Sequence, residues 1–252
     1  MPKLLAIVPA YNEEAAVGGV VRDLRENAPE LDVLVVDDGS TDATATVARF
    51  AGAHVLRMPF NIGIGGTVQA GYQYALEHGY DYAVQVDGDG QHDAREVHRL
   101  LDHLREHPEI NMVTGSRFLE ECRDGSFRST RSRRMGIRIF AGILSAITRE
   151  RITDPTSGFR MTNRRGIELF ARDYPHDYPE VEAVLMVHAH RLLRDEIPVR
   201  MHARQAGVSS INASRSVYYM VKVLLAIFVG LFRARPIVER GDQAAVTAEP
   251  SL

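Results

Sequence analysis

The chain has 252 residues, of which 45% are hydrophobic and 25% are charged, and its formal net charge is -3. This composition supports one large α/β domain or two small ones and excludes a disordered chain. The nearly balanced charge argues against a general nucleic-acid-binding protein. A single cysteine, Cys122, excludes an internal disulfide and a cysteine-rich metal cluster. The N-terminal residues lack the pattern of a secretory signal, so we expect the protein in the cytoplasm.

The first ninety residues alternate between short apolar runs and amphipathic stretches. Apolar runs predict buried strands at 4–8, 31–36, 54–58 and 82–86. Helical patterns beginning near residues 12, 42 and 66 separate these strands. Strands joined by crossover helices predict a mostly parallel, doubly wound, Rossmann-like central sheet with helices on both faces.

Polar residues follow three of the predicted strands, in segments 11–13, 37–38 and 87–89. Ligands of doubly wound sheets bind outside the carboxyl ends of the strands, so these segments predict one shared crevice. Asp87 and Asp89, separated by one glycine, suit a hard divalent cation such as Mg²⁺ or Mn²⁺. An acidic turn without metal is the alternative. An EF-hand is less suitable because no Glu stands at loop position twelve.

The glycine-rich segment 61–66 follows the third predicted strand and does not have the G-x-G-x-x-G spacing. We therefore exclude an NAD-dependent dehydrogenase. The glycines are explained either by close helix packing or by direct contact with a phosphate.

A helix is expected over 94–106, and the next strand, 112–117, ends on the cation Arg117, whose natural partner is a phosphate or a carboxylate. Six further arginines follow: Arg123, Arg128, Arg131, Arg133, Arg134 and Arg138. They lead into an apolar helical stripe over 135–147. This arrangement favours an anionic lipid surface or a polyanionic ligand over a merely solvated face.

The remaining pattern predicts a loop at 154–160, a helix at 180–194 and a strand at 197–203. We expect a catalytic domain over 1–212, an amphipathic helix over 213–236 and a disordered tail over 237–252. The apolar part of the C-terminal helix is too short for a typical bilayer span. It suits packing on the core, the membrane interface or a homo-oligomer contact.

Five segments together resemble the GT-A glycosyltransferases of family 2, over about residues 3–210. They are 7–14 (IVPAYNEE), 36–42 (VDDGSTD), 87–92 (DGDGQH), 115–117 (GSR) and 157–160 (SGFR). The last two are similar to segments of the dolichol-phosphate and polyprenyl-phosphate mannosyl- and glucosyltransferases. The chain is thus identified as closest to that branch.

The resemblance implies a metal-dependent, inverting transfer of a hexose from a GDP-mannose or UDP-glucose type of donor to a polyprenyl or dolichyl phosphate. It implies that the donor contacts residues at the strand ends: Pro9, Tyr11, Glu13, Asp38, Asp87 and Gly88. It also implies that Asp87, Asp89 and Gln91 surround an Mg²⁺ or Mn²⁺ ion that bridges the donor diphosphate.

Arg117, Arg131 and Ser157 resemble the site of the acceptor phosphate in this branch. We expect Asp89 and Arg117 to act in catalysis, and an anionic acceptor needs no strong general base. If the acceptor is instead a soluble or polysaccharide hydroxyl compound, a carboxylate must deprotonate it, and Asp154 is the candidate.

Many relatives that build lipid-linked sugars carry transmembrane helices after the catalytic domain, whereas this chain has only the basic, apolar segment 215–235. We therefore expect peripheral attachment to the cytoplasmic face of a membrane, or a small membrane-protein partner. Two other classes compete. A non-catalytic nucleotide-sugar-binding protein is disfavoured by the intact Asp87 and Asp89, and a nucleotidyltransferase by the absence of a Gly- and Arg-rich phosphate loop at its N-terminus.

Overall fold

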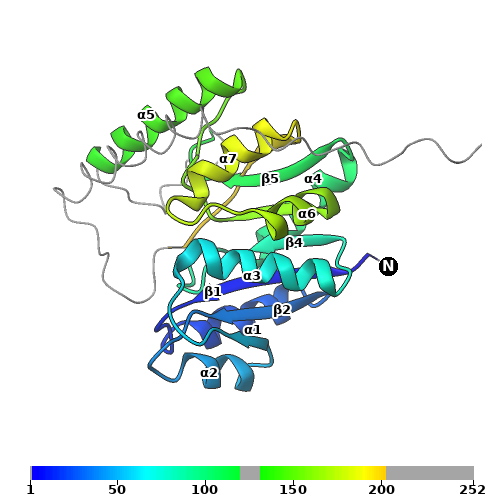
Figure 1. Cartoon of the computed structure of the whole chain (residues 1–252), viewed down its shortest axis with the longest axis vertical. Helices are drawn as coiled ribbons and strands as arrows, with labels where there is room; N and C mark the ends of the chain where they lie inside the picture. Colours follow the sequence, from blue (N-terminus) through cyan, green and yellow to red (C-terminus); the bar gives the residue numbers. More distant parts are fainter. Residues whose placement is uncertain (1, 120–130, 203–252) are drawn as a thin grey trace, which may run out of the picture.

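The computed structural model describes residues 2–119 and 131–202, which form one seven-stranded sheet with helices on both faces (Figure 1). The strands are β1 (Leu4–Ala10), β2 (Leu31–Asp37), β3 (His54–Arg57), β4 (Tyr82–Gln85), β5 (Ile110–Ser116), β6 (Arg160–Asn163) and β7 (Leu193–Pro198). The helices are α1 (Val17–Asn27), α2 (Thr44–Phe50), α3 (Gly63–Glu77), α4 (Val97–Glu106), α5 (Arg131–Thr148), α6 (Arg164–Arg172) and α7 (Pro179–Ala189), with a short 3-10 helix at Ala94–Glu96.

The strand order is β3-β2-β1-β4-β6-β5-β7, and every neighbouring pair is parallel except those made by β6. β6 runs antiparallel between β4 and β5, where Arg160 lies opposite Gln85 on one side and Thr114 on the other. The predicted mostly parallel α/β sheet is confirmed. Along the chain, β2 and β3 are added on one side of β1, whereas β4 is added on its other side. Sheets of this kind bind ligands at such a switch point, here between β1 and β4.

The two faces of the sheet bury different helices because alternate residues of a strand point to opposite sides. In β1, Leu4, Ala6 and Val8 belong to a buried cluster that also contains residues of α1 and α4. Leu5 and Ile7 belong to a second cluster, formed with α3 and α6. Figure 1 shows α3 and α6 lying across this second face. The core therefore fixes both sides of β1, whose carboxyl end leads into the polar segment 11–13.

Two predicted element boundaries were wrong in the second half of the chain. The helix that begins near Glu180 ends at Ala189 rather than at 194, and Arg191 has a positive φ of 57°. That left-handed residue redirects the backbone, so β7 runs over Leu193–Pro198 instead of 197–203. Strand β7 therefore begins to pair with β5 at Leu193, four residues before the strand start that the apolar pattern predicted.

Helix α1 also begins later than predicted, at Val17 instead of near residue 12. Asn12 has a φ of 54°, and its side-chain oxygen accepts a hydrogen bond from the backbone N–H of Thr41 at 2.9 Å. Residues 11–16 thus form a turn tied to the segment after β2.

In the part of the chain that the structure covers, no helix combines the length and the apolar character that crossing a membrane requires. The predicted helix at 213–236 and tail at 237–252 lie outside the described residues.

Candidate active site

A cavity of about 380 Å³ lies at the carboxyl ends of β1, β2 and β4. Its walls come from these strand ends, from the start of α3 and from the start of α7. The lining residues are Pro9, Ala10, Tyr11, Glu13, Asp38, Asn61, Gly63, Ile64, Thr67, Asp87, Gly88, Asp89 and Glu180. The structure thus brings into one cavity every residue that the sequence suggested for the donor: Pro9, Tyr11, Glu13, Asp38, Asp87 and Gly88.

The wall after β1 is held by hydrogen bonds from its backbone to the segment after β2. The backbone N–H of Asn12 donates to Ser40 Oγ at 2.9 Å, and that of Glu13 donates to Thr44 Oγ1 at 2.8 Å. Tyr11 keeps 47% of its surface exposed at the cavity. An exposed aromatic ring beside a cavity is available for stacking on a planar ligand.

Asp38 is buried and uses both carboxylate oxygens to hold the glycine-rich turn. Oδ1 accepts a hydrogen bond from the backbone N–H of Ile62 at 2.7 Å, and Oδ2 accepts one from Gly63 at 3.1 Å. A Cβ on Gly65 would lie 2.2 Å from the carbonyl oxygen of Pro175, so close packing explains that glycine. Gly63, in contrast, lines the cavity. Asp38 therefore shapes the cavity wall as well as lining it.

Asp87 and Asp89 follow β4 and present carboxylates at the cavity. The side chain of Asp87 is 37% exposed, and its Oδ1 accepts a hydrogen bond from Gln85 Nε2 at 3.2 Å. Asp89 is more buried, and its Oδ1 accepts a hydrogen bond from the backbone N–H of Gln91 at 3.1 Å. The two acids thus share one tight turn, with Gln91 directly beside them.

The donor set fits a divalent ion that is shared with a bound phosphate. Within residues 2–119 and 131–202, no group of three or more His, Cys, Asp or Glu side chains is arranged to hold a metal by itself. Mg²⁺ is commonly bound by one or two carboxylates while substrate phosphates and water complete the shell. Asp87 and Asp89, which both line the cavity, match this incomplete protein shell. Gln91 follows them in the same turn but is not one of the residues that line the cavity.

Glu180 is a cavity residue that the sequence analysis missed. It stands in the first turn of α7, far from the strand-end motifs, and it is half-buried. Burial raises the pKa of the Glu180 carboxyl, and the charge of Asp87 raises it further, while Arg160 lowers it. The only sequence signal was its place directly after the irregular aromatic segment 174–179.

Arg117 and Asp154 form a bidentate ion pair at the end of β5. Arg117 Nε lies 2.6 Å from Asp154 Oδ2, and Nη2 lies 2.8 Å from Oδ1. Asp154 is fully buried, and each of its two oxygens accepts a hydrogen bond from the guanidinium. Burial alone would lower the pKa of Arg117, but its hydrogen bonds and charge contact with Asp154 raise it. A base role for Asp154 would require a free carboxylate. In the structure this carboxylate is paired with Arg117.

The other suggested acceptor residues are described only in part. Ser157 is buried, and its hydroxyl donates a hydrogen bond to the carbonyl oxygen of Gly115 at 2.7 Å. That proton is therefore committed to the backbone and not available to a phosphate. Arg131 begins α5, but its side chain lies outside the described structure, as do Arg123 and Arg128.

Arg160 connects the Arg117 side of the site to the cavity. Its guanidinium is buried and donates from Nε to the carbonyl oxygen of Ser157 at 2.8 Å. Nη2 donates to the carbonyl oxygens of Pro155 and Glu180. One side chain thus fixes both the loop that carries Asp154 and the start of α7. The sequence contained the SGFR motif but gave no role to this arginine.

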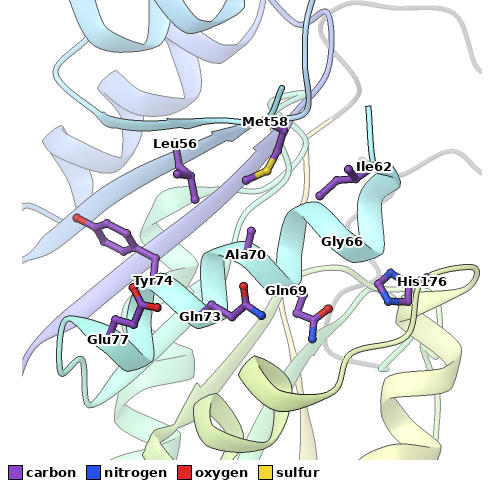
Figure 2. A pocket seen from close by; sticks show the side chains of 10 residues that line it. All are labelled: Leu56, Met58, Ile62, Gly66, Gln69, Ala70, Gln73, Tyr74, Glu77 and His176. Carbon is purple, nitrogen blue, oxygen red and sulfur yellow. The ribbon is translucent and has the colours of Figure 1, made fainter. Parts of the chain in front are cut away.

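A larger cavity of about 520 Å³ lies between α3 and the end of β3. Figure 2 shows its lining: Leu56, Met58, Ile62, Gly66, Gln69, Ala70, Gln73, Tyr74, Glu77 and His176. It contains none of the strand-end residues suggested for the donor or the metal. We therefore assign the site to the smaller cavity, where the paired carboxylates lie.

Residues 5–170 match the family model described as "Glycosyl transferase family 2". The chain is 29% identical to the polyprenol monophosphomannose synthase of Mycolicibacterium smegmatis over 231 residues, which is 88% of this chain and 85% of the relative. It is 40% identical to the undecaprenyl-phosphate mannosyltransferase of Micrococcus luteus over 120 residues, which is 46% of this chain and only 48% of that relative.

Solved structures show the same fold. The glucosyl-3-phosphoglycerate synthase of Mycobacterium tuberculosis, in complex with Mn²⁺, UDP-glucose and phosphoglyceric acid, superposes with a TM-score of 0.69. The alignment covers 91% of this chain and 79% of that chain, with 19% identity. The motifs, the family match and the curated relatives agree, and the chain belongs to glycosyl transferase family 2.

Proposed function

We propose that this glycosyltransferase moves a hexose from a nucleotide-diphosphate sugar to a polyprenyl phosphate, with the help of Mg²⁺ or Mn²⁺. The observation that carries the proposal is the cavity in which the acids after β4 meet the ends of β1 and β2. The names of the two bacterial relatives support the lipid-phosphate acceptor. The donor is of the GDP-mannose or UDP-glucose type.

In this proposal the base and ribose lie beside Pro9, Tyr11, Glu13 and Asp38, and the diphosphate lies over Gly88. The exposed ring of Tyr11 supplies a stacking surface, and Asp38 holds the turn at Ile62 and Gly63 that closes this end of the cavity. Glu180, on the opposite element, is a hydrogen-bond acceptor for hydroxyl groups of the sugar. The donor would thus extend from β1 and β2 toward α7.

Asp87, Asp89 and Gln91 would hold the metal against the diphosphate. The bound ion would neutralise negative charge that develops on the departing nucleoside diphosphate, and Mn²⁺ in the M. tuberculosis structure supports this use. Asp89 would therefore take part in catalysis by holding this ion. Asp87 serves both donor binding and the metal, and Gly88 serves donor binding.

Arg117, with Arg131, would bind the acceptor phosphate. The phosphate is already anionic, so its oxygen attacks the sugar without a strong base, and inversion at the anomeric carbon follows from a single displacement. Asp154 then serves to orient Arg117, in agreement with its burial and its two contacts to the guanidinium. Ser157 supports the same loop through its bond to Gly115.

The proposal includes peripheral attachment to the cytoplasmic face of a membrane through two basic, apolar segments, 123–147 and 213–236. Each basic residue near an anionic surface adds on the order of 1 kcal/mol of attraction. A homo-oligomer contact or a small membrane-protein partner is the other use of the second segment.

Two measurements test these parts separately. Thermal unfolding with a panel of GDP- and UDP-sugars and Mn²⁺ should reveal one donor that stabilises the parent protein but not Asp89→Ala. Co-sedimentation with anionic liposomes should succeed at low salt and fail at high salt. No stabilisation by any donor would refute the nucleotide-sugar site, and no sedimentation at low salt would refute the attachment.

A further inference from the structure

The imidazole of His92 contacts Asp87 through both of its nitrogen atoms. Nδ1 accepts a hydrogen bond from the backbone N–H of Asp87 at 3.0 Å, and Nε2 lies 3.6 Å from Asp87 Oδ2. The side chain of His92 is only 4% exposed, and its ring packs on Phe159 with 4.8 Å between the ring centroids. His92 thus closes the 87–92 turn on itself.

These contacts fix the tautomer of the ring. A nitrogen that accepts a hydrogen bond carries no proton, so the single proton of the neutral imidazole is on Nε2. Asp87 Oδ2 lies 3.6 Å from that nitrogen.

The other carboxylate oxygen of Asp87 has its own neutral donor. Gln85 is 3% exposed, and its Nε2 donates to Asp87 Oδ1 at 3.2 Å. Gly158 permits this arrangement, because a Cβ there would lie 3.0 Å from both Asp87 Oδ1 and Gln85 Nε2. Gln85 therefore donates a hydrogen bond to one oxygen of Asp87, and Nε2 of the buried His92 lies 3.6 Å from the other, while the carboxylate remains partly exposed at the cavity.

We propose that His92 and Gln85 are positioning residues that hold the Asp87 carboxylate in the orientation needed to bind a divalent cation. The inference rests on the proposed function, because it assigns the cation to the Asp87–Asp89 turn. Neutral donors suit this task better than an arginine or a lysine would. They fix the rotamer of the carboxylate and leave its full negative charge for the cation.

The geometry allows variants that separate the two contacts of His92. Asparagine places a side-chain oxygen near the position of Nδ1, so His92→Asn can keep the bond from the Asp87 N–H while losing the group that faces Oδ2. Gln85→Met keeps the length of the side chain and removes its N–H donor. His103→Asn is the matched control, because His103 pairs with Asp195 at 2.9 Å on α4, away from the cavity.

The test is a titration of each protein with Mn²⁺ in the presence of UDP or GDP, in which free Mn²⁺ is followed by electron paramagnetic resonance. Loss of such supporting contacts typically weakens metal affinity by about 10- to 100-fold. We expect that loss in His92→Asn and in Gln85→Met, with no change in His103→Asn. Thermal unfolding without metal should show that the variants remain folded.

The possible failures are distinguishable. If the parent binds Mn²⁺ and both variants bind it equally well, the inference is overturned and the proposed metal site stands. If the parent binds no Mn²⁺ with either nucleotide, both are overturned. If His92→Asn does not fold, Gln85→Met alone decides, and parental Mn²⁺ affinity in that variant overturns the inference.

Discussion

The guanidinium of Arg117 donates two hydrogen bonds, of 2.6 and 2.8 Å, to the carboxylate of Asp154, and Asp154 is completely buried. The pair joins the end of β5 to the loop that precedes β6. Thr156 adds a hydroxyl contact to the same guanidinium at 3.0 Å. Both oxygens of this buried acid therefore accept hydrogen bonds from the guanidinium, which holds Arg117 in a fixed orientation.

The first prediction is that Arg117→Ala strongly destabilises the protein, because it leaves a buried carboxylate without its counter-charge. Breaking a buried pair in this way costs about 3–5 kcal/mol of unfolding free energy. Urea denaturation measures the loss. Arg105→Ala is the control, since Arg105 and Asp102 are 3.9 Å apart and both exposed, and we expect a change within about 0.5 kcal/mol. A loss below about 1 kcal/mol in Arg117→Ala would contradict the pairing.

A second prediction concerns the metal. Asp89→Ala should weaken Mn²⁺-dependent donor binding by about 10- to 150-fold, the range that corresponds to about 1.5–3 kcal/mol for a contact with a charged group. Asp87→Asn should lose activity with little loss of stability, because adjacent carboxylates repel each other in the apo protein. Calorimetric titration with and without Mn²⁺ measures the binding. Unchanged Mn²⁺ dependence in Asp89→Ala would exclude this residue as a ligand.

The third prediction is that Asp38→Ala raises the donor KM and also lowers stability. The substitution removes the acceptor of two backbone hydrogen bonds, from Ile62 and Gly63, and so loosens the wall formed by the start of α3. We expect a loss of about 1.5–3 kcal/mol in unfolding free energy, and a smaller loss for Asp38→Asn, which keeps one oxygen. Steady-state kinetics gives the KM. A parental KM with a collapsed kcat would assign Asp38 to the chemistry instead.

A fourth prediction follows from the raised pKa of Glu180. In the folded protein this carboxyl keeps its proton above its ordinary value of 4.5, where the unfolded chain has already released it. The native state then binds more protons than the unfolded state, so this group makes the unfolding free energy fall as pH rises through that window. Glu180→Gln should remove the fall, and its stability advantage over the parent should grow from acidic pH toward neutrality.

Urea unfolding of the donor-free protein at a series of pH values measures this difference. Glu168→Gln is the control, because Glu168 is exposed and pairs only weakly with Arg164, at 3.4 Å. A Glu180→Gln advantage that is constant across the pH series would show that burial does not raise the pKa of Glu180.

The sequence was sufficient to predict the sheet and the cavity because both follow from local patterns. Apolar runs mark the strands, and the carboxyl ends of parallel strands necessarily meet at one edge of a sheet. Asp38 and Asp87 therefore could be assigned to one crevice although 49 positions separate them (87 − 38).

The contacts made through β6 could not be predicted in the same way. Arg117 and Asp154 are 37 positions apart and meet only because the antiparallel β6 returns between β4 and β5. Considered separately, one was assigned to the acceptor phosphate and the other to a base role. Glu180 was missed because no strand end precedes it. The buried guanidinium of Arg160 ties the start of α7 to this loop by hydrogen bonds, and Val181 and Val184 of α7 share a buried apolar cluster with Ile152 of the same loop.

The most direct measurement is transfer of a labelled hexose from GDP-mannose or UDP-glucose to undecaprenyl phosphate in the presence of Mn²⁺, with a soluble phosphate acceptor in a parallel reaction. The account predicts label in an organic-soluble, lipid-linked product that requires Mn²⁺ and disappears in Asp89→Ala. Transfer to the soluble acceptor without any lipid-linked product would contradict the assignment of the acceptor.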